Sequence, residues 1–391
     1  MARTSLLARA VAALAATAAL TVGAPAAGAA ASAWAATVPA GARTPGASAA
    51  LPALPHPDSH GLTLVNWAPV AGSAGRMADA TFTTGAVFAP RGGTPLISPV
   101  RVPVTVRIFL PADYRADAPV PYPVLYLLHG GGGDFRQWSQ GGSGNLAATL
   151  AGSAFPGIAV MPEGGRAGWY SDWAGQTDGR FAPQWETFHI EQLLPWIDDN
   201  FLTVKDRSGR AVAGASMGGY GALRYAGRHP ELFSAVGAFS GGTGVYQAGA
   251  QRTIADSMWQ AGAAIGWTGL LNPWYRVSGD TLHRMETVFG PRAGWPSVNP
   301  VSLALTDAYR EYAGKLALYA GGAGGAGETD IHGWNRSLHE DLDSRSTAHR
   351  YCTGSGEHDY RYWTEELKDF VALVYGATPS ECPNGWGSPT P

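Results

Sequence analysis

Hydrophobic residues alternate with polar ones early in the chain and form continuous runs further along. Residues 102–110 (VPVTVRIFL) alternate like a strand, and residues 62–65 and 80–83 are short β-prone segments. Residues 123–128 (PVLYLL) and 158–161 (IAVM) are then apolar throughout. Continuous apolar runs of this length are typical of strands buried on both faces of a sheet.

From this point the pattern predicts strands and helices in alternation. The predicted strands are residues 211–215, 235–239, 316–320 and 349–352, and the predicted helices are residues 186–201, 218–228, 335–342 and 363–375. Such alternation predicts an α/β fold with a mostly parallel central sheet flanked by helices. Residues 241–299 interrupt the alternation and predict a loop-rich insertion over the carboxyl edge of the sheet. Tryptophans gather there, namely Trp259, Trp267, Trp274 and Trp295, with Trp334 beyond.

The first residues have the layout of a secretory signal peptide. Arg3 and Arg9 precede an apolar run over residues 10–22, and the small-residue site Ala33-Trp34-Ala35 follows. The run is too short to span a bilayer comfortably. We expect residues 1–35 to be a signal peptide, residues 36–58 a flexible linker, residues 59–378 one folded domain and residues 379–391 a C-terminal tail. The mature chain is then secreted, without a membrane span.

Composition narrows the possible partners. Lys and Arg number 27 and Asp and Glu 30, so the net charge is −3, and only 15% of residues are charged. A nucleic-acid binder is therefore not expected. Cys352 and Cys382 are the two cysteines, and an even count in an exported chain favours one disulfide between them. Without clustered histidines beside these cysteines, the sequence predicts no metal site, and it predicts no cofactor.

One motif carries the chemistry. Gly214-Ala215-Ser216-Met217-Gly218 fits Gly-x-Ser-x-Gly and lies between a predicted strand and a predicted helix. In that context the serine is held on a strained turn above the sheet edge, where it can act as a nucleophile. A chain with 53 glycines also produces this spacing by accident, and the alternative is a structural turn serine.

A serine nucleophile needs a base and an orienting carboxylate, which follow it in the order acid then histidine. His358 follows the last predicted strand, from where it can reach Ser216. The acid is expected after the strand at residues 316–320, where the loop to residue 330 offers Glu328 and Asp330. We take Asp330 as the acid and Glu340, on the next helix, as the alternative. A solvated carboxylate or helix cap remains possible for either.

The oxyanion of an acyl-transfer reaction needs two N–H donors. We expect the backbone N–H groups of Met217 and of Gly131, which lies in the run of four glycines after His129. Glycines let a backbone turn its amides toward a site. The competing interpretation, a phosphate-binding loop, lacks the lysine that such a loop requires.

At these residues the chain resembles a family of α/β-hydrolases that includes S-formylglutathione hydrolase-type esterases and the secreted antigen 85-type mycolyltransferases. The resemblance covers residues 81–375. It rests on six segments, namely residues 126–131 (YLLHGG), 170–173 (YSDW), 185–188 (WETF), 214–219 (GASMGG), 229–233 (HPELF) and 358–363 (HDYRYW). It implies the α/β-hydrolase fold and an acyl-enzyme on Ser216, with His358 as base.

The sequence departs from the mycolyltransferases at His129, and its two candidate acids match different branches of the family. Mycolyltransferases have an Asp where this chain has His129, and their catalytic Glu matches Glu340, whereas the family's simple esterases match Asp330. The resemblance therefore implies a serine esterase acting on an acyl ester, or alternatively an acyltransferase that moves the acyl chain to a sugar or glycolipid acceptor. A third possibility is a non-catalytic wall-binding protein on the same scaffold.

Overall fold

The computed structural model describes residues 51–87, 103–175, 182–244, 247, 251, 285–312, 314–322 and 327–388. They belong to one compact unit, Thr44–Pro391. The expected signal peptide, the first part of the expected linker and residues 252–284 of the expected insertion lie outside the described residues.

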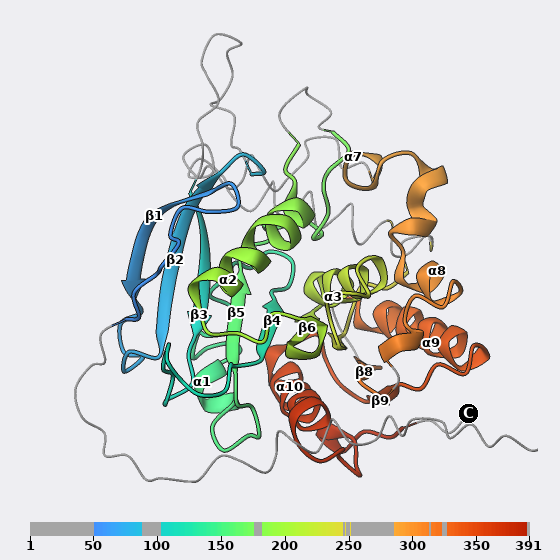
Figure 1. The fold of residues 1–391 in the computed structure, drawn as a ribbon. Helices are drawn as coiled ribbons and strands as arrows, with labels where there is room; N and C mark the ends of the chain where they lie inside the picture. Colours follow the sequence, from blue (N-terminus) through green and yellow to red (C-terminus); the bar gives the residue numbers. More distant parts are fainter. Residues whose placement is uncertain are drawn as a thin grey trace, which may run out of the picture. The chain divides into compact units, whose positions relative to one another are not determined.

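Nine strands of the described chain form one sheet in the order β1-β2-β3-β5-β4-β6-β7-β8-β9 (Figure 1). Pairing is antiparallel from β1 to β5 and parallel from β5 to β9, so the sheet is mostly parallel, as the sequence predicts. The strands are β1 (Leu62–Pro69), β2 (Met77–Thr84), β3 (Val104–Phe109), β4 (Val124–Leu128), β5 (Ile158–Pro162), β6 (Arg210–Ala215), β7 (Ala235–Phe239), β8 (Leu316–Gly321) and β9 (Arg350–Gly354).

Helices cover both faces of this sheet (Figure 1). They are α1 (Leu146–Thr149), the π-helical η1 (Thr187–Leu193), α2 (Leu194–Asn200), α3 (Met217–Arg228), α7 (Met285–Phe289), α8 (Pro300–Ala304), α9 (Glu328–Ser344) and α10 (Tyr360–Tyr375). Short 3-10 segments are η2 (Arg207–Gly209), η3 (Arg292–Ser297), η4 (Arg310–Tyr312) and η5 (Pro383–Gly385). The helix expected at residues 335–342 is longer than predicted and begins at Glu328.

Side chains on the two faces of the sheet belong to two separate hydrophobic clusters. Tyr126 and Leu128 of β4 pack with side chains from η1, α2, α3 and α9. Leu125 and Leu127 of the same strand pack with side chains from α1 and α10. Because successive side chains of a strand point to opposite faces, a continuous apolar run is what a sheet between two helical layers requires.

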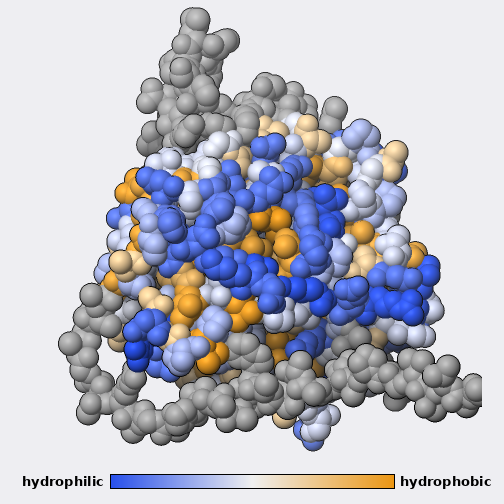
Figure 2. Space-filling model, viewed as in Figure 1, coloured by the Kyte–Doolittle hydropathy of each residue, from blue (hydrophilic) through white to orange (hydrophobic). Residues whose placement is uncertain are grey.

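Polar residues form most of the face seen in Figure 2, with apolar patches between them. In the part of the chain that the structure describes, no helix has the length and apolarity needed to cross a membrane.

Both ends of the described chain are attached to the domain. Asn200 of α2 makes two hydrogen bonds with the backbone of His56, at 2.8 and 2.9 Å. Within the expected linker, the backbone groups of His56 and Pro57 are therefore bound by side chains of α2. At the other end, Cys352 of β9 forms a disulfide with Cys382, which confirms the predicted pairing.

Candidate active site

Ser216 lies at a sharp turn between β6 and α3. Its backbone has φ 56° and ψ −118°, a conformation that residues other than glycine rarely adopt. Its N–H donates to the Phe239 carbonyl at 2.8 Å, and its own carbonyl accepts from the Tyr220 N–H at 3.1 Å. A serine held in this way between a parallel strand and a helix presents its hydroxyl at the carboxyl edge of the sheet.

The glycines of the motif follow from close packing around this turn. A Cβ on Gly214 would lie 2.4 Å from the carbonyl oxygen of Gly218, and a Cβ on Gly218 would lie 2.3 Å from that of Leu128. Both contacts are to backbone atoms, so a larger residue at either position would push α3 away from the sheet. The two glycines of the Gly-x-Ser-x-Gly motif are therefore required by the close packing of α3 on the sheet.

His358 lies between β9 and α10, and its Nδ1 atom is 2.6 Å from Oε2 of Glu328. Glu328 is the first residue of α9 and is fully buried. Its Oε1 atom accepts from the Ser240 hydroxyl at 2.8 Å and from the Gly321 N–H at 2.9 Å. Because a carboxylate oxygen only accepts, Nδ1 of His358 carries the proton and Nε2 presents its lone pair.

The carboxylate beside His358 is neither of the two that the sequence predicted. Asp330 is exposed, since two residues along a helix turn it by about 200° away from the buried side of Glu328. Glu340 is also exposed and pairs with Arg336 at 2.9 Å on the solvent face of α9. The structure therefore places Glu328, and neither Asp330 nor Glu340, beside His358, because α9 begins at Glu328, inside the stretch predicted to be a loop.

Several backbone groups of the glycine run after β4 already make hydrogen bonds. The Gly130 carbonyl accepts from the Gly133 N–H at 3.2 Å, and the Gly132 N–H donates to the Arg166 carbonyl at 2.6 Å. The N–H groups of Gly131 and Met217 make no backbone hydrogen bond to a described residue. A Cβ on Gly131 would lie 3.9 Å from that of Met217, so the two expected oxyanion donors are neighbours.

His129 orients the first peptide of this loop. Its Nε2 accepts from the Gly164 N–H at 2.9 Å, so its Nδ1 carries the proton and donates to the Gly130 carbonyl at 2.8 Å. Burial lowers the pKa of His129 to about 4, so the ring is neutral at physiological pH. The bond to the Gly130 carbonyl restrains the same peptide unit that carries the Gly131 N–H.

Ser216, His358 and part of the glycine run line a cavity of about 290 Å³. A second hollow, of about 400 Å³, shares Gly142, Asp359 and Tyr360 with the first. The first is lined by Gly130, Gly131, Gln137, Gly142, Ser216, His358, Asp359, Tyr360 and Trp363. Ser216, His358 and Gly131, three of the residues predicted to act together, therefore line one cavity.

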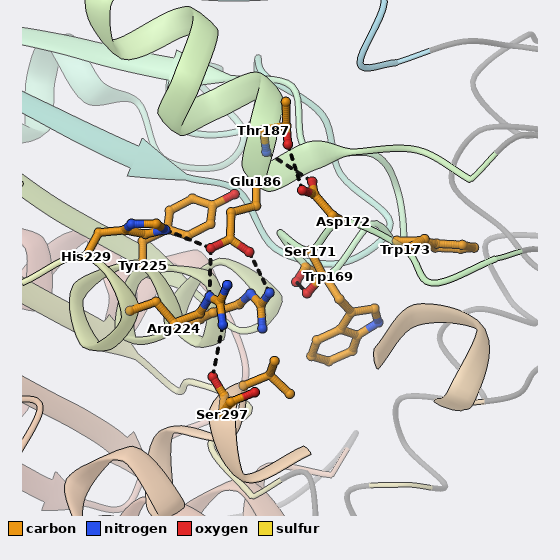
Figure 3. A network of polar contacts seen from close by, with 12 residues as sticks. Trp169, Ser171, Asp172, Trp173, Glu186, Thr187, Arg224, Tyr225, His229 and Ser297 are labelled. Atoms are coloured by element: carbon orange, nitrogen blue, oxygen red, sulfur yellow. Dashed lines mark hydrogen bonds and ion pairs between the residues drawn. The ribbon is translucent and has the colours of Figure 1, made fainter. Parts of the chain in front are cut away.

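Helix α3, which follows Ser216 in the chain, is held by an ionic network around the buried Glu186 (Figure 3). Glu186, which precedes η1, accepts from Arg224 at 2.5 Å and from Arg228 and His229 at 2.8 Å each. Burial would raise the pKa of Glu186, but the hydrogen bond from His229 and the positive charges of Arg224 and Arg228 lower it to about 2. This carboxylate ties the end of α3 to η1.

Two further hydrogen bonds hold the first residue of η1. Asp172 accepts from the Thr187 N–H at 3.0 Å and from the Thr187 hydroxyl at 2.7 Å (Figure 3). The two segments WETF and YSDW, which contribute to the resemblance in the sequence, are thus bound to each other, and Glu186 also binds α3.

Residues 100–373 match the family model Esterase, described as "Putative esterase". The chain belongs to this esterase family. The esterase Rv1288 of Mycobacterium tuberculosis is 36% identical over 265 residues, which cover 66% of this chain and 52% of that protein. The chain therefore spans about half the length of this relative. The diacylglycerol acyltransferase/mycolyltransferase Ag85B of Mycobacterium leprae is 27% identical over 259 residues, covering 63% of this chain and 73% of that protein.

A solved structure shares the fold. FphF, a fluorophosphonate-binding serine hydrolase of Staphylococcus aureus, aligns with a TM-score of 0.54 at 16% identity, over 76% of this chain and 98% of its own. This chain therefore has the α/β-hydrolase fold that the resemblance predicted.

Proposed function

We propose that this protein is a serine esterase that cleaves carboxylic esters through an acyl-enzyme on Ser216. The observation that carries the proposal is the 2.6 Å contact between His358 and the buried Glu328, with His358 and Ser216 lining the same cavity. A nucleophile, a base and an orienting acid at these places are what acyl transfer requires.

Each group has a role in this reaction. His358 Nε2 takes the hydroxyl proton as Ser216 Oγ attacks the acyl carbonyl, and Glu328 stays ionised and stabilises the imidazolium. The N–H groups of Gly131 and Met217 donate to the oxyanion. His358 then gives the proton to the leaving alcohol as its C–O bond breaks. Water repeats the sequence on the acyl-enzyme, which releases the acid and restores Ser216.

A second candidate is transfer of the acyl group to a hydroxyl of a sugar or glycolipid. It is supported by the similarity to a protein named as an acyltransferase and by the second hollow. That hollow is lined mostly by polar side chains, including Asn145, Thr149, Arg361 and Lys368. A hydroxylated acceptor or leaving group bound there would lie beside the cavity that Ser216 lines, because the two hollows share Gly142, Asp359 and Tyr360.

Export is part of the proposal. The Cys352–Cys382 disulfide persists in oxidising compartments outside the cytosol, and relatives named as mycobacterial antigens are consistent with this location. The mass of the protein recovered from culture medium tests export and the cleavage near residue 35 together.

The decisive experiment measures hydrolysis of p-nitrophenyl esters of increasing chain length, with and without trehalose as acceptor. Ser216→Ala should lower kcat by at least about 10³-fold, because the acyl-enzyme cannot form. Full activity in Ser216→Ala would refute the assignment of the nucleophile. Acyl-trehalose formed faster than free acid would favour the second candidate over hydrolysis.

A further inference from the structure

A second group of ionisable side chains lies at the far end of α9 from Glu328. His339 and Asp343 are four residues apart, so they share one side of this helix, and His349 lies just before β9. One possible ligand atom from each of the three lies within 4.8 Å of the others. The sequence predicted no metal site because the two cysteines have no clustered histidines beside them. In the structure, the turn after α9 brings His339 and His349 together.

The hydrogen bonds of His349 define which nitrogen can bind a cation. Its Nδ1 lies 2.7 Å from the Thr347 carbonyl, which only accepts, so Nδ1 carries the proton and Nε2 presents its lone pair. That lone pair faces Nδ1 of His339 at 2.8 Å, so a single proton lies between the two rings. A ligating histidine whose other nitrogen donates to a carbonyl is the usual arrangement at metal sites.

The remaining geometry also favours a cation. The His339 ring stacks on Tyr351 with centroids 4.3 Å apart, which restrains its orientation. Asp343 Oδ2 lies 3.4 Å from His339 Nε2, and the Asp343 side chain is 36% exposed. The carboxylate can therefore rotate, and it supplies the negative charge that a bound cation needs.

We propose that His339, Asp343 and His349 bind a divalent transition-metal ion, with Zn²⁺ as the best match. Zn²⁺ takes nitrogen and oxygen ligands at about 2.0–2.2 Å, whereas Ca²⁺ and Mg²⁺ prefer oxygen ligands alone. Tetrahedral geometry places two nitrogen ligands about 3.3 Å apart, so the two rings need to separate only slightly. The ion replaces the proton between the rings, which is released to solvent, and water takes the fourth position.

This ion would join the end of α9 to the beginning of β9. Glu328 begins α9 and His358 follows β9, so the ion would stabilise the two elements that hold this pair. Ligand binding to the folded state alone raises the midpoint of thermal unfolding. The proposal does not depend on ester cleavage, because metal affinity and unfolding temperature measure it directly.

The experiment uses tag-free full chain, treated with EDTA and dialysed, in calorimetric titrations with ZnCl₂ and with MgCl₂. We expect the wild type and Glu340→Gln, a control on the exposed face of α9, to bind one Zn²⁺ at this site and to unfold at a higher temperature with Zn²⁺. Asp343→Asn and His339→Gln should each weaken binding by about tenfold or more.

Three results would overturn the proposal. These are no Zn²⁺ binding by the wild type, equal affinity in the wild type and Asp343→Asn, or Mg²⁺ binding as tightly as Zn²⁺. Asp343 is partly exposed, so Asp343→Asn tests the site even where His339→Gln disturbs the packing on Tyr351.

Discussion

Glu328 is fully buried, yet both of its oxygens have polar partners. Oε2 contacts His358, and Oε1 accepts from Ser240, whose hydroxyl oxygen in turn accepts from Trp363 Nε1 at 3.1 Å. A second buried carboxyl, Glu366, lies behind it on α10. Burial and the negative charges of Glu328 and Asp369 raise the pKa of Glu366 well above its usual value. Burial therefore disfavours the charged form of Glu366.

These two carboxyls give a matched test of the acid. Glu328→Gln should lower kcat for ester hydrolysis by about 10³- to 10⁴-fold, because the amide no longer stabilises the imidazolium of His358. Glu366→Gln makes the same chemical change in a carboxyl that does not line the cavity and whose charged form burial disfavours, so kcat should stay within about twofold, as it should for exposed Asp330→Asn. Steady-state kinetics on folded variants decide, and comparable losses in Glu328→Gln and Asp330→Asn would contradict the assignment.

Glu163, beside the glycine loop, makes stability depend on pH. Burial, helped by the negative charge of Asp134, raises its pKa to about 8. Between the unfolded pKa near 4.5 and pH 8 the folded chain binds one more proton than the unfolded chain, so this group's contribution is full below 4.5 and is lost as pH rises. Glu163→Gln should flatten the fall in unfolding free energy over this window. Denaturant titrations at several pH values test this, and parallel profiles would refute it.

At the scale of elements, the Glu186 carboxylate joins η1 to the end of α3. Glu186→Gln would leave Arg224 buried beside a neutral amide, and breaking a buried ion pair costs about 3–5 kcal/mol of unfolding free energy. Glu191→Gln, at an exposed position of η1, is the control and should change stability by less than about 0.5 kcal/mol. Urea unfolding monitored by tryptophan fluorescence measures both variants. A loss in Glu186→Gln no larger than in the control would mean that other contacts hold α3.

The elements differ in how well the sequence predicts them. The parallel strands are predicted closely because each is a short apolar run, and Ser216 is identified because β6 and α3 flank its motif. The start of α9 is missed because Gly327 caps it without a side-chain hydrogen bond and the first buried apolar residue is Ile331. Glu328 therefore looks like a loop residue. Its burial depends on contacts with Ser240 and His358, which are distant in sequence.

At the scale of the whole molecule, the disulfide connects the last strand to the C-terminal segment across 30 residues. Closing a loop of this length restricts the unfolded chain, which is worth about 3–4 kcal/mol of unfolding free energy. Cys382→Ala should therefore unfold at lower denaturant concentration than the wild type, and reduction should destabilise the wild type but not the variant. Equal midpoints for oxidised and reduced wild type would contradict this.

The four residues of the proposed reaction follow four different parallel strands: Gly131 after β4, Ser216 after β6, Glu328 after β8 and His358 after β9. They are spread from residue 131 to residue 358, so no short fragment of the chain contains them, and the central strands pair residues that are distant in sequence, such as Val124 with Arg210. Chains with such non-local pairing fold slowly. In the proposed mechanism turnover therefore requires a completely folded sheet, because His358 follows β9 and reaches the cavity only when β9 is paired with β8.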